Sequence, residues 1–415
     1  MRIKLVNGVY LTIIPTTKYT TTKIMVNFAT KQTLTNSAVR NVLVNLLVNA
    51  SQSYPNQTAM ARQLAKMYGA ELDGYVTRMG TTHNVRISLS CVNQTITPAM
   101  KISEALKFMR ELIFNPLVSQ GQLSPESWQL QRNNLAATLT SWEDDKQYLA
   151  AKRLLELYFV NGSAMRIPST GSAELITNVT SEQLMVAYRQ MITHDQVDII
   201  IEGNVSPDEI TQQLQNWPFK ARPSLEQKIF YQQQSSANVR TCHEHDDIQQ
   251  AKLNLAYSVP IYYLDRAYYP AIVMNGLFGA GPYSLLFKNV REKASLAYYA
   301  SSGYRPFAGY LFVQSGIDGK DHQRTQSLIT QQLQTIQDGQ INNHDLEQVR
   351  KNIVNGYLTA QDSPNHLIGQ ALVSSLAGMT LPTNPVEQIQ SVSRQQVSEA
   401  AQQLNLQAIY YLDRG

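Results

Sequence analysis

The stretch that decides the fold is a long helical segment that occurs twice in the chain. Residues 123–145 read LSPESWQLQRNNLAATLTSWEDD, and residues 341–363, about 218 positions later, read INNHDLEQVRKNIVNGYLTAQDS. Three identities fall in this register: Arg132 with Arg350, Asn134 with Asn352, and Asp144 with Asp362. A Ser followed by Pro opens the first copy and an Asn caps the second, which are typical helix starts. We therefore expect an internal duplication.

The elements around the repeated helix recur in the same order. Each half predicts a first strand, a helical region, a strand pair, long helices, a shorter helix and a last strand. The strands are expected at 23–28, 70–77, 83–91 and 197–201, and at 252–257, 295–304, 309–316 and 408–412. Because tight turns such as Arg78-Met79-Gly80 join the paired strands, each sheet should be mainly antiparallel, with helices packed on one face. We predict an α+β fold of two homologous domains.

A segment without periodicity separates the two halves. Residues 216–240 contain Pro218, Pro223, three consecutive glutamines and two serines, which interrupt both helical and strand patterns. We therefore predict a first α+β domain over 1–215, a linker over 216–240 and a second α+β domain over 241–415.

The composition indicates a soluble chain of about two domains. Of the 415 residues, 43% are hydrophobic and 16% charged, with a formal net charge of +4. Two cysteines are too few for a disulfide framework, and no apolar run approaches the roughly 18 residues of a membrane span. Lysine and arginine are scattered singly rather than clustered. We expect a cytoplasmic protein with neither a membrane nor a nucleic-acid partner, and we interpret the first residues as strands of the mature protein.

A glycine-rich segment and the residues after it resemble the signature of a known family. Residues 275–287 read NGLFGAGPYSLLF and residues 290–299 read VREKASLAYY. This combination of a glycine-rich turn, a short helix with Arg-Glu-Lys and a Leu-Ala-Tyr strand is similar to the second domain of the pitrilysin/insulysin zinc peptidases, which include the mitochondrial processing peptidase. The resemblance covers essentially the whole chain and implies duplicated α+β domains, which the repeat requires independently.

The resemblance implies an inverted zincin motif, H-x-x-E-H, on a helix of the first domain, but the residues of that motif are absent. The helical run 39–48 places Asn41 and Asn45 at the histidine positions and Val44 at the glutamate position. A neutral amide is a poor ligand for zinc, and valine cannot take a proton from water. We therefore expect no metal or other cofactor in this chain, with zinc only on a partner.

The third zinc ligand of the family is a glutamate on the long helix downstream. Alignment on residues 142–145 places Thr138 at that position, and Glu143 is the alternative. In either case one carboxylate cannot rebuild a site that needs three protein ligands and a general base. The chain is expected to be inactive alone, and its status as an enzyme within a pair stays open.

An arginine and a tyrosine of the second domain match the family's substrate-binding pair. In active members these two side chains bind the substrate carbonyl and stabilise developing negative charge. Arg291 and Tyr298 have the required spacing, and a guanidinium and a phenol are both suitable donors to an oxyanion. Spacing alone more often means a surface arginine and a packed tyrosine, but the family context favours the functional interpretation. Gly279 and Gly281 are candidate peptide contacts, with a simple turn as the alternative.

Some members of the family work as pairs, in which one chain holds the zinc motif and the other lacks it. The sequence thus predicts the non-metal subunit of a heterodimeric zinc peptidase, which acts on a peptide or small protein together with a zinc-bearing paralogue. The alternative is an inactive structural or peptide-binding scaffold of the same fold. The isolated chain could also form a homodimer.

The run from Cys242 to Asp247 is the one cluster of metal-ligand residue types in the sequence. On a strand, His243 and His245 project to one face and Cys242 and Glu244 to the other, so one ion cannot gather all four. Two histidines at i and i+2 can chelate a metal, and a metalloenzyme built on them is a third hypothesis, although an exposed edge strand is the commoner case. His83, among alternating apolar residues, is expected to be structural.

Overall fold

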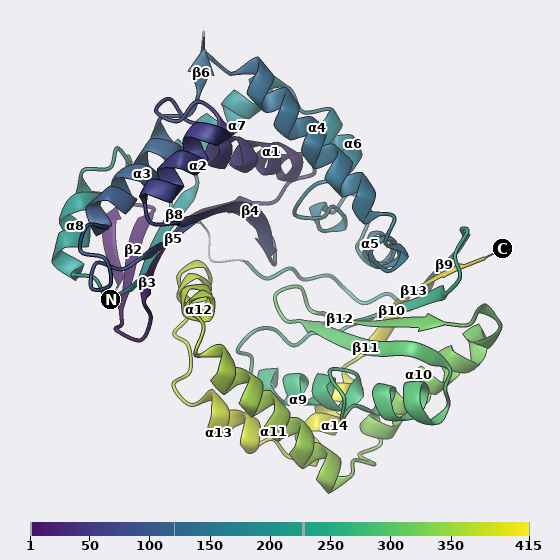
Figure 1. The fold of residues 1–415 in the computed structure, drawn as a ribbon. Helices are drawn as coiled ribbons and strands as arrows, with labels where there is room; N and C mark the ends of the chain where they lie inside the picture. Colours follow the sequence, from purple (N-terminus) through teal and green to yellow (C-terminus); the bar gives the residue numbers. More distant parts are fainter. Residues whose placement is uncertain (1, 120, 226–228, 415) are drawn as a thin grey trace. The chain divides into compact units, whose positions relative to one another are not determined.

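The chain folds into two compact units, which are described separately (Figure 1). The computed structural model describes residues 2–119, 121–225 and 229–414. Unit 1 comprises Met1–Thr140, Ile167–Ile229 and Gln361–Leu381. Unit 2 comprises Ser141–Arg166, Phe230–Ala360 and Pro382–Gly415.

Unit 1 is built on a six-stranded sheet with the order β1-β2-β8-β3-β5-β4. The strands are β1 (Arg2–Val6), β2 (Val9–Pro15), β3 (Thr21–Lys31), β4 (Glu71–Met79), β5 (Thr82–Val92) and β8 (Gln196–Gly203). Strands β2 and β8 pair in parallel, and every other neighbouring pair in this sheet is antiparallel. Most residues of β3 and β5 and every residue of β8 are buried, which makes these strands the centre of the sheet.

Helices from both halves of the chain cover the unit 1 sheet. They are α1 (Asn36–Asn49), α2 (Gln57–Lys66), α3 (Ile102–Phe114), α4 (Pro125–Trp142), α6 (Ala173–Thr177), α7 (Ser181–Thr193), α8 (Pro207–Gln215) and α12 (Pro364–Ala377), with a short strand pair, β6 (Val118–Ser119) and β7 (Gln122–Leu123). The core joins Phe28 and Ile87 of the sheet to Leu43 and Leu47 of α1. Helix α7 begins with a capping box at Thr180, as its sequence suggests.

Unit 2 contains a five-stranded sheet with the order β11-β12-β10-β13-β9. Its strands are β9 (Arg240–His245), β10 (Ala251–Ser258), β11 (Ala297–Arg305), β12 (Tyr310–Ile317) and β13 (Asn405–Asp413). Its helices are α5 (Lys146–Tyr158), α9 (Tyr268–Phe278), α10 (His322–Gln337), α11 (Asn343–Ala360), α13 (Pro385–Gln390) and α14 (Arg394–Gln402), with short helical turns η1 (Ala164–Arg166) and η3 (Gly319–Asp321) and a π-helical segment η2 (Leu286–Lys293). Here only β13 and β9 pair in parallel.

The predicted duplication is confirmed by the topology of the two sheets. The order β2-β8-β3-β5-β4 in unit 1 repeats as β9-β13-β10-β12-β11 in unit 2, with the parallel pair at the same place. Helices α4 and α11 begin at Pro125 and Asn343, in the register read from the sequence. The fold is therefore α+β with mainly antiparallel sheets, as predicted.

Each repeat contributes one helix to the unit built mainly from the other repeat. Helix α5 belongs to unit 2 and α12 to unit 1. In unit 1, Ser375 of α12 hydrogen-bonds Asp198 of β8, and in unit 2, Leu154 and Tyr158 of α5 pack on Tyr410 of β13. These contacts use the sheet face opposite the main core. The expected packing of helices on one face was thus incomplete, and the compact units differ from the contiguous ranges 1–215 and 241–415.

The segment predicted as a linker is irregular in the structure. The described residues of 216–239 form neither helix nor strand, and the boundary between the two units falls within this segment, after Ile229. Among the described helices, none combines the length and the apolar character that crossing a membrane requires.

Candidate functional site

Arg291 and Tyr298 line one open hollow on the surface of unit 2. The hollow has a volume of about 530 Å³. Arg291 lies in the last turn of η2, and Tyr298 lies near the start of the edge strand β11. The other lining residues are Glu292, Ser295, Leu296, Ala297, Asp318, Lys320 and Asp321. The structure thus brings the two sequence-predicted donors together, although six residues and a change of secondary structure lie between them.

Local backbone irregularities aim these two side chains into solvent. Ala297 pairs with Ile317 and Tyr299 with Gly316, so Tyr298 is the extra residue of a β-bulge. Bulges redirect side chains, and the Tyr298 side chain is 70% exposed. Arg291 belongs to a π-helical turn, a rare form that is frequent at functional sites. Both distortions fall on the two residues that the sequence selected.

Neighbouring side chains position the Arg291 guanidinium but leave it able to bind a further group. Its Cζ lies 4.7 Å from the centre of the Phe287 ring, and its Nε lies 3.4 Å from Glu292 Oε1. Because both charged groups are about half exposed, this surface ion pair contributes little stability. The guanidinium therefore remains able to bind an anionic or carbonyl oxygen. Sequence reasoning did not select Asp318, Lys320 and Asp321, which reach the hollow from η3 and the residue before it.

The helix that corresponds to the zinc motif uses its amides for structure. Asn41 is buried and donates from Nδ2 to the carbonyl oxygen of Thr170 at 2.9 Å. Asn45 donates from Nδ2 to the carbonyl oxygen of Asn41 at 2.8 Å. Val44 is fully buried and packs against the edge strand β4, where a Cβ on Gly74 would come within 3.0 Å of Val44 Cγ2. These three residues therefore do not fit a zinc ion.

Neither candidate for the third zinc ligand completes a site. Thr138 is exposed on α4 and donates from Oγ1 to the carbonyl oxygen of Asn134 at 2.9 Å. Glu143 Oε1 lies 2.5 Å from Lys152 Nζ, so an ion pair already occupies this carboxylate. In residues 2–119, 121–225 and 229–414, no cluster of three possible ligands forms on α1.

The glycines of residues 275–287 have a clear structural role. Gly279 ends α9, and its carbonyl oxygen accepts a hydrogen bond from the Ser302 backbone N–H at 3.1 Å. A Cβ on Gly279 would lie 2.6 Å from that same nitrogen. Gly281 has φ of +115°, a conformation that side chains disfavour. Close packing and a turn therefore explain both glycines, and their proposed contact with a peptide stays a prediction.

Replacing Gly279 by alanine is expected to destabilise unit 2 by about 1–3 kcal/mol, because the new methyl group would push against the backbone of β11. The matched control is Gly356→Ala on α11, where a Cβ meets nothing within 4 Å. That change should stabilise the helix by about 0.5–1 kcal/mol. Urea denaturation of both variants measures the difference, and equal effects at the two positions would contradict the packing role of Gly279.

His243 and His245 lie on the same face of β9, as predicted. Cys242 and Glu244 point to the other face, where Glu244 Oε2 accepts a hydrogen bond from Tyr410 Oη at 2.8 Å. On the first face, both histidine rings reach Asp413 at the end of β13. Sequence reasoning missed Asp413, although the alternation of β13 places it on the same face as Tyr411.

His83 is a structural residue, as the sequence suggested. It is fully buried; its Nδ1 accepts a hydrogen bond from Arg40 Nε at 3.1 Å, and its Nε2 donates to the carbonyl oxygen of Ser169 at 2.9 Å. Burial, with a smaller effect from the Arg40 charge, lowers the pKa of His83 to about 3. The ring is therefore neutral at physiological pH and has no free nitrogen for catalysis or metal binding.

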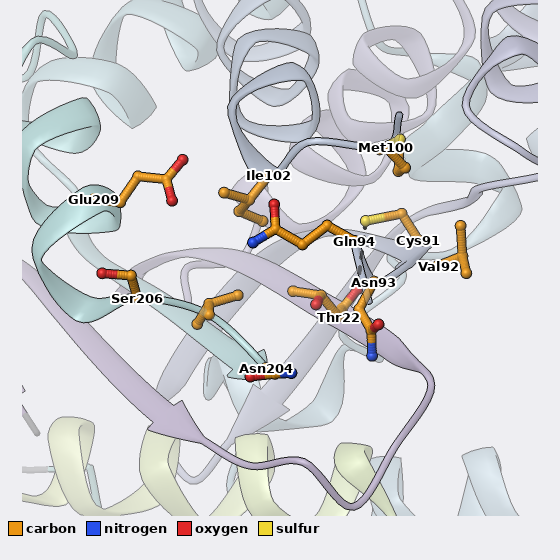
Figure 2. Close-up of a pocket in the computed structure, with 11 residues that line it drawn as sticks. Thr22, Cys91, Val92, Asn93, Gln94, Met100, Ile102, Asn204, Ser206 and Glu209 are labelled. Atoms are coloured by element: carbon orange, nitrogen blue, oxygen red, sulfur yellow. Dashed lines mark hydrogen bonds between the residues drawn. The ribbon is translucent and has the colours of Figure 1, made fainter. Parts of the chain in front are cut away.

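A small pocket in unit 1 contains Cys91 but no reactive group (Figure 2). Figure 2 shows that its lining comes from the start of β3, the end of β5 with the two residues after it, Met100 and the start of α3, and the residues from 204 into the first turn of α8. Burial raises the pKa of the Cys91 thiol to about 11. A thiol that stays protonated is a poor nucleophile, so this pocket has no predicted chemistry.

Known proteins are similar to this chain over part or all of its length. Residues 178–353 match the family profile "Peptidase M16 inactive domain". A Bacillus subtilis protein named "Probable inactive metalloprotease YmfF" is 26% identical over 410 residues, which cover 98% of this chain and 96% of that protein. The crystal structure of a conserved protein from Enterococcus faecalis superposes with a TM-score of 0.96 at 36% identity, over 100% and 98% of the two chains.

A more distant structure shares the fold. The crystal structure of a peptidase M16 inactive domain from Pseudomonas fluorescens is 18% identical, with a TM-score of 0.77 over 99% of this chain and 97% of the other. The profile match places residues 178–353 in the M16 peptidase family, as a domain of the inactive type, and the likeness to YmfF extends over 98% of the chain. Both findings agree with the predicted resemblance to the pitrilysin/insulysin-like zinc peptidases. Its motif helix carries Asn41, Val44 and Asn45 instead of the zinc-binding residues.

Proposed function

We propose that this chain is the non-metal subunit of a heterodimeric peptidase and has no peptidase activity alone. In this proposal, Arg291 and Tyr298 bind the carbonyl oxygen of a peptide whose cleavage occurs at the zinc site of a paralogous partner. The observation that carries the proposal is the combination of an unusable motif helix with two exposed donors in one hollow.

The chemistry of the two donors suits a developing oxyanion. When a peptide carbonyl becomes tetrahedral, negative charge grows on its oxygen, and prepositioned donors stabilise that charge more than they stabilise the substrate. Arg291 supplies a permanent positive charge and Tyr298 a neutral O–H donor. Because the benefit appears mainly in the transition state, loss of either donor should lower kcat more than it raises KM.

The test uses the full chain mixed with the zinc-bearing paralogue from the same genome and a set of unstructured peptide substrates. We expect the pair to cleave peptides and either chain alone to be much slower. Arg291→Ala and Tyr298→Phe should each lower kcat of the pair by roughly 10²-fold with KM nearly unchanged. Circular dichroism and size-exclusion chromatography check that each variant folds and still pairs.

Two exposed residues away from the hollow provide matched controls, namely Arg394→Ala on α14 and Tyr68→Phe after α2. These controls should leave kcat within about twofold of the parent pair, since surface changes away from a site have small effects. Full activity of an Arg291→Ala/Tyr298→Phe double variant in a stable pair would contradict the proposal. That result would favour a structural or peptide-binding scaffold instead.

A further inference from the structure

Two histidines and an aspartate converge at one edge of the unit 2 sheet, and we propose that they bind a divalent transition-metal ion such as Zn²⁺. His243 Nε2 lies 3.0 Å from Asp413 Oδ1, and His245 Nδ1 lies 2.5 Å from the same oxygen. All three candidate ligand atoms lie within 4.8 Å of one another. This is the only group of three or more potential ligands in the described part of the chain. None of its three residues lines the hollow that contains Arg291, although Asp413 lies beside Gly319, between two residues of that hollow.

The spacing of these atoms fits a tetrahedral ion after small side-chain rotations. Zinc bonds of about 2.0–2.2 Å to nitrogen and oxygen place tetrahedral ligand atoms roughly 3.3–3.5 Å apart. The two nitrogen-to-oxygen distances of 3.0 and 2.5 Å are slightly shorter, because hydrogen bonds now join the atoms that an ion would hold apart. Three protein ligands leave a fourth position for water. Imidazole and carboxylate ligands favour Zn²⁺ over Mg²⁺, which prefers oxygen alone.

The strand pairing holds the three side chains on one face before any ion binds. In the parallel pair of β9 and β13, His243 is opposite Tyr411 and His245 is opposite Asp413. The His243 ring lies 4.7 Å from the Tyr411 ring, which stacks on His322 at 3.9 Å. Tyr411 Oη donates to the carbonyl oxygen of Gly319 at 3.0 Å. The strand pairing fixes the backbone, and the contact with Tyr411 restricts the His243 ring. Binding of an ion would therefore need only small side-chain movements.

An ion at this position would cross-link the edge strand β9 to the end of β13. These two strands are held in parallel only along Arg240–His245 and Ala408–Asp413. A ligand that binds the folded state and not the unfolded chain stabilises the fold in proportion to its concentration relative to Kd. The site is therefore expected to be structural, and it needs no partner chain.

The test titrates Zn²⁺ into the untagged, metal-free full chain by isothermal calorimetry. We expect one Zn²⁺ per chain, no measurable Mg²⁺ binding, and a rise in Tm on addition of zinc. His243→Ala, His245→Ala and Asp413→Asn should each weaken binding by more than about 100-fold and abolish the rise in Tm. Asp413→Asn preserves the shape of the side chain, so it separates loss of a ligand from misfolding.

Three control variants identify the ligands. His194→Ala and His344→Ala remove exposed histidines elsewhere, and Cys242→Ser removes the thiol on the opposite face of β9. All three should keep the parent affinity. Absence of zinc binding by the parent chain, or binding by His243→Ala and Asp413→Asn with the parent affinity, would overturn the proposal. Loss of binding in Cys242→Ser would overturn the assignment of the ligands.

Discussion

Replacing Arg40 by alanine is expected to lower the free energy of unfolding by about 3–5 kcal/mol, because it leaves a buried aspartate without its charge partner. Arg40 Nη1 lies 2.6 Å from Asp195 Oδ2, and the two residues are 3% and 4% exposed. Arg40 Nη2 also donates to the carbonyl oxygen of Phe28 at 3.0 Å. The pair joins the motif helix α1 to the residues just before β8.

The same substitution removes the donor to His83 Nδ1. Burial already raises the pKa of Asp195, and the Arg40 charge opposes that rise. Without Arg40, the aspartate must take a proton or stay charged in a buried position where the Arg222 charge only partly offsets the loss of hydration, and both cost free energy. The effect should therefore exceed that of a typical surface arginine severalfold.

Urea denaturation at pH 7, followed by circular dichroism, measures this effect. Arg62→Ala, on the exposed surface of α2, is the matched control and should change stability by less than about 0.5 kcal/mol. An Arg40→Met/Asp195→Asn double variant should lose less than the sum of the single variants, because it removes both charges together. A loss below about 1 kcal/mol in Arg40→Ala would show that the pair does not stabilise unit 1.

Replacing Glu202 by glutamine is expected to remove about 3 kcal/mol of pH-dependent destabilisation from unit 1. Glu202 is fully buried on β8, and within the described residues neither carboxylate oxygen has a hydrogen-bond partner. Burial raises the pKa of Glu202 from 4.5 to about 7, and the charge of Lys23 only partly opposes this. The folded state thus prefers the protonated form.

The direction of the effect follows from proton binding. Between pH 4.5 and about 7 the folded chain holds a proton that the unfolded chain has released, so the contribution of Glu202 to stability falls as pH rises. Below pH 4.5 both states are protonated and the penalty is absent. Glutamine is neutral at every pH, so the variant should gain on the parent chain as pH rises and reach its full advantage above pH 7.

Denaturation of both chains at pH 4.5 and pH 8 measures this difference directly. The free energy of unfolding of the variant, minus that of the parent, should be about 3 kcal/mol larger at pH 8 than at pH 4.5. Glu71→Gln, at the exposed start of β4, is the control and should change stability by less than about 0.5 kcal/mol. A difference that is constant across this range would mean that the pKa of Glu202 is the same in the folded and unfolded states, which contradicts the prediction.

The sequence contained enough local information to predict most elements and the duplication. Helices α4 and α11 begin at the predicted register because their caps and apolar periodicity are local signals. The absence of histidines at Asn41 and Asn45 was equally readable, since it depends only on residue type. Arg291 and Tyr298 were found through a family signature, and the π-helical turn and the bulge that place them in one hollow were not.

The residues that sequence analysis missed are those that meet across long separations. Asp413 reaches His245 from 168 residues away, and no periodicity links the two positions. Asp195 similarly looks like an ordinary polar residue before a strand, although it is the buried partner of Arg40. Gly279, a candidate peptide contact with a turn as the alternative, also packs against Ser302, and that packing depends on the approach of α9 to β11.

The sequence by itself determined the α+β class, the two repeats and the loss of the zinc ligands, because these depend on residue types and on periods of two or 3.6 residues. Only the tertiary structure showed that α5, from the first repeat, packs in unit 2 and that α12, from the second repeat, packs in unit 1. It alone also decided that Asp413 joins two histidines and that Glu202 is buried without a partner. These outcomes arise from strand pairing and burial over long chain separations, which local patterns do not encode.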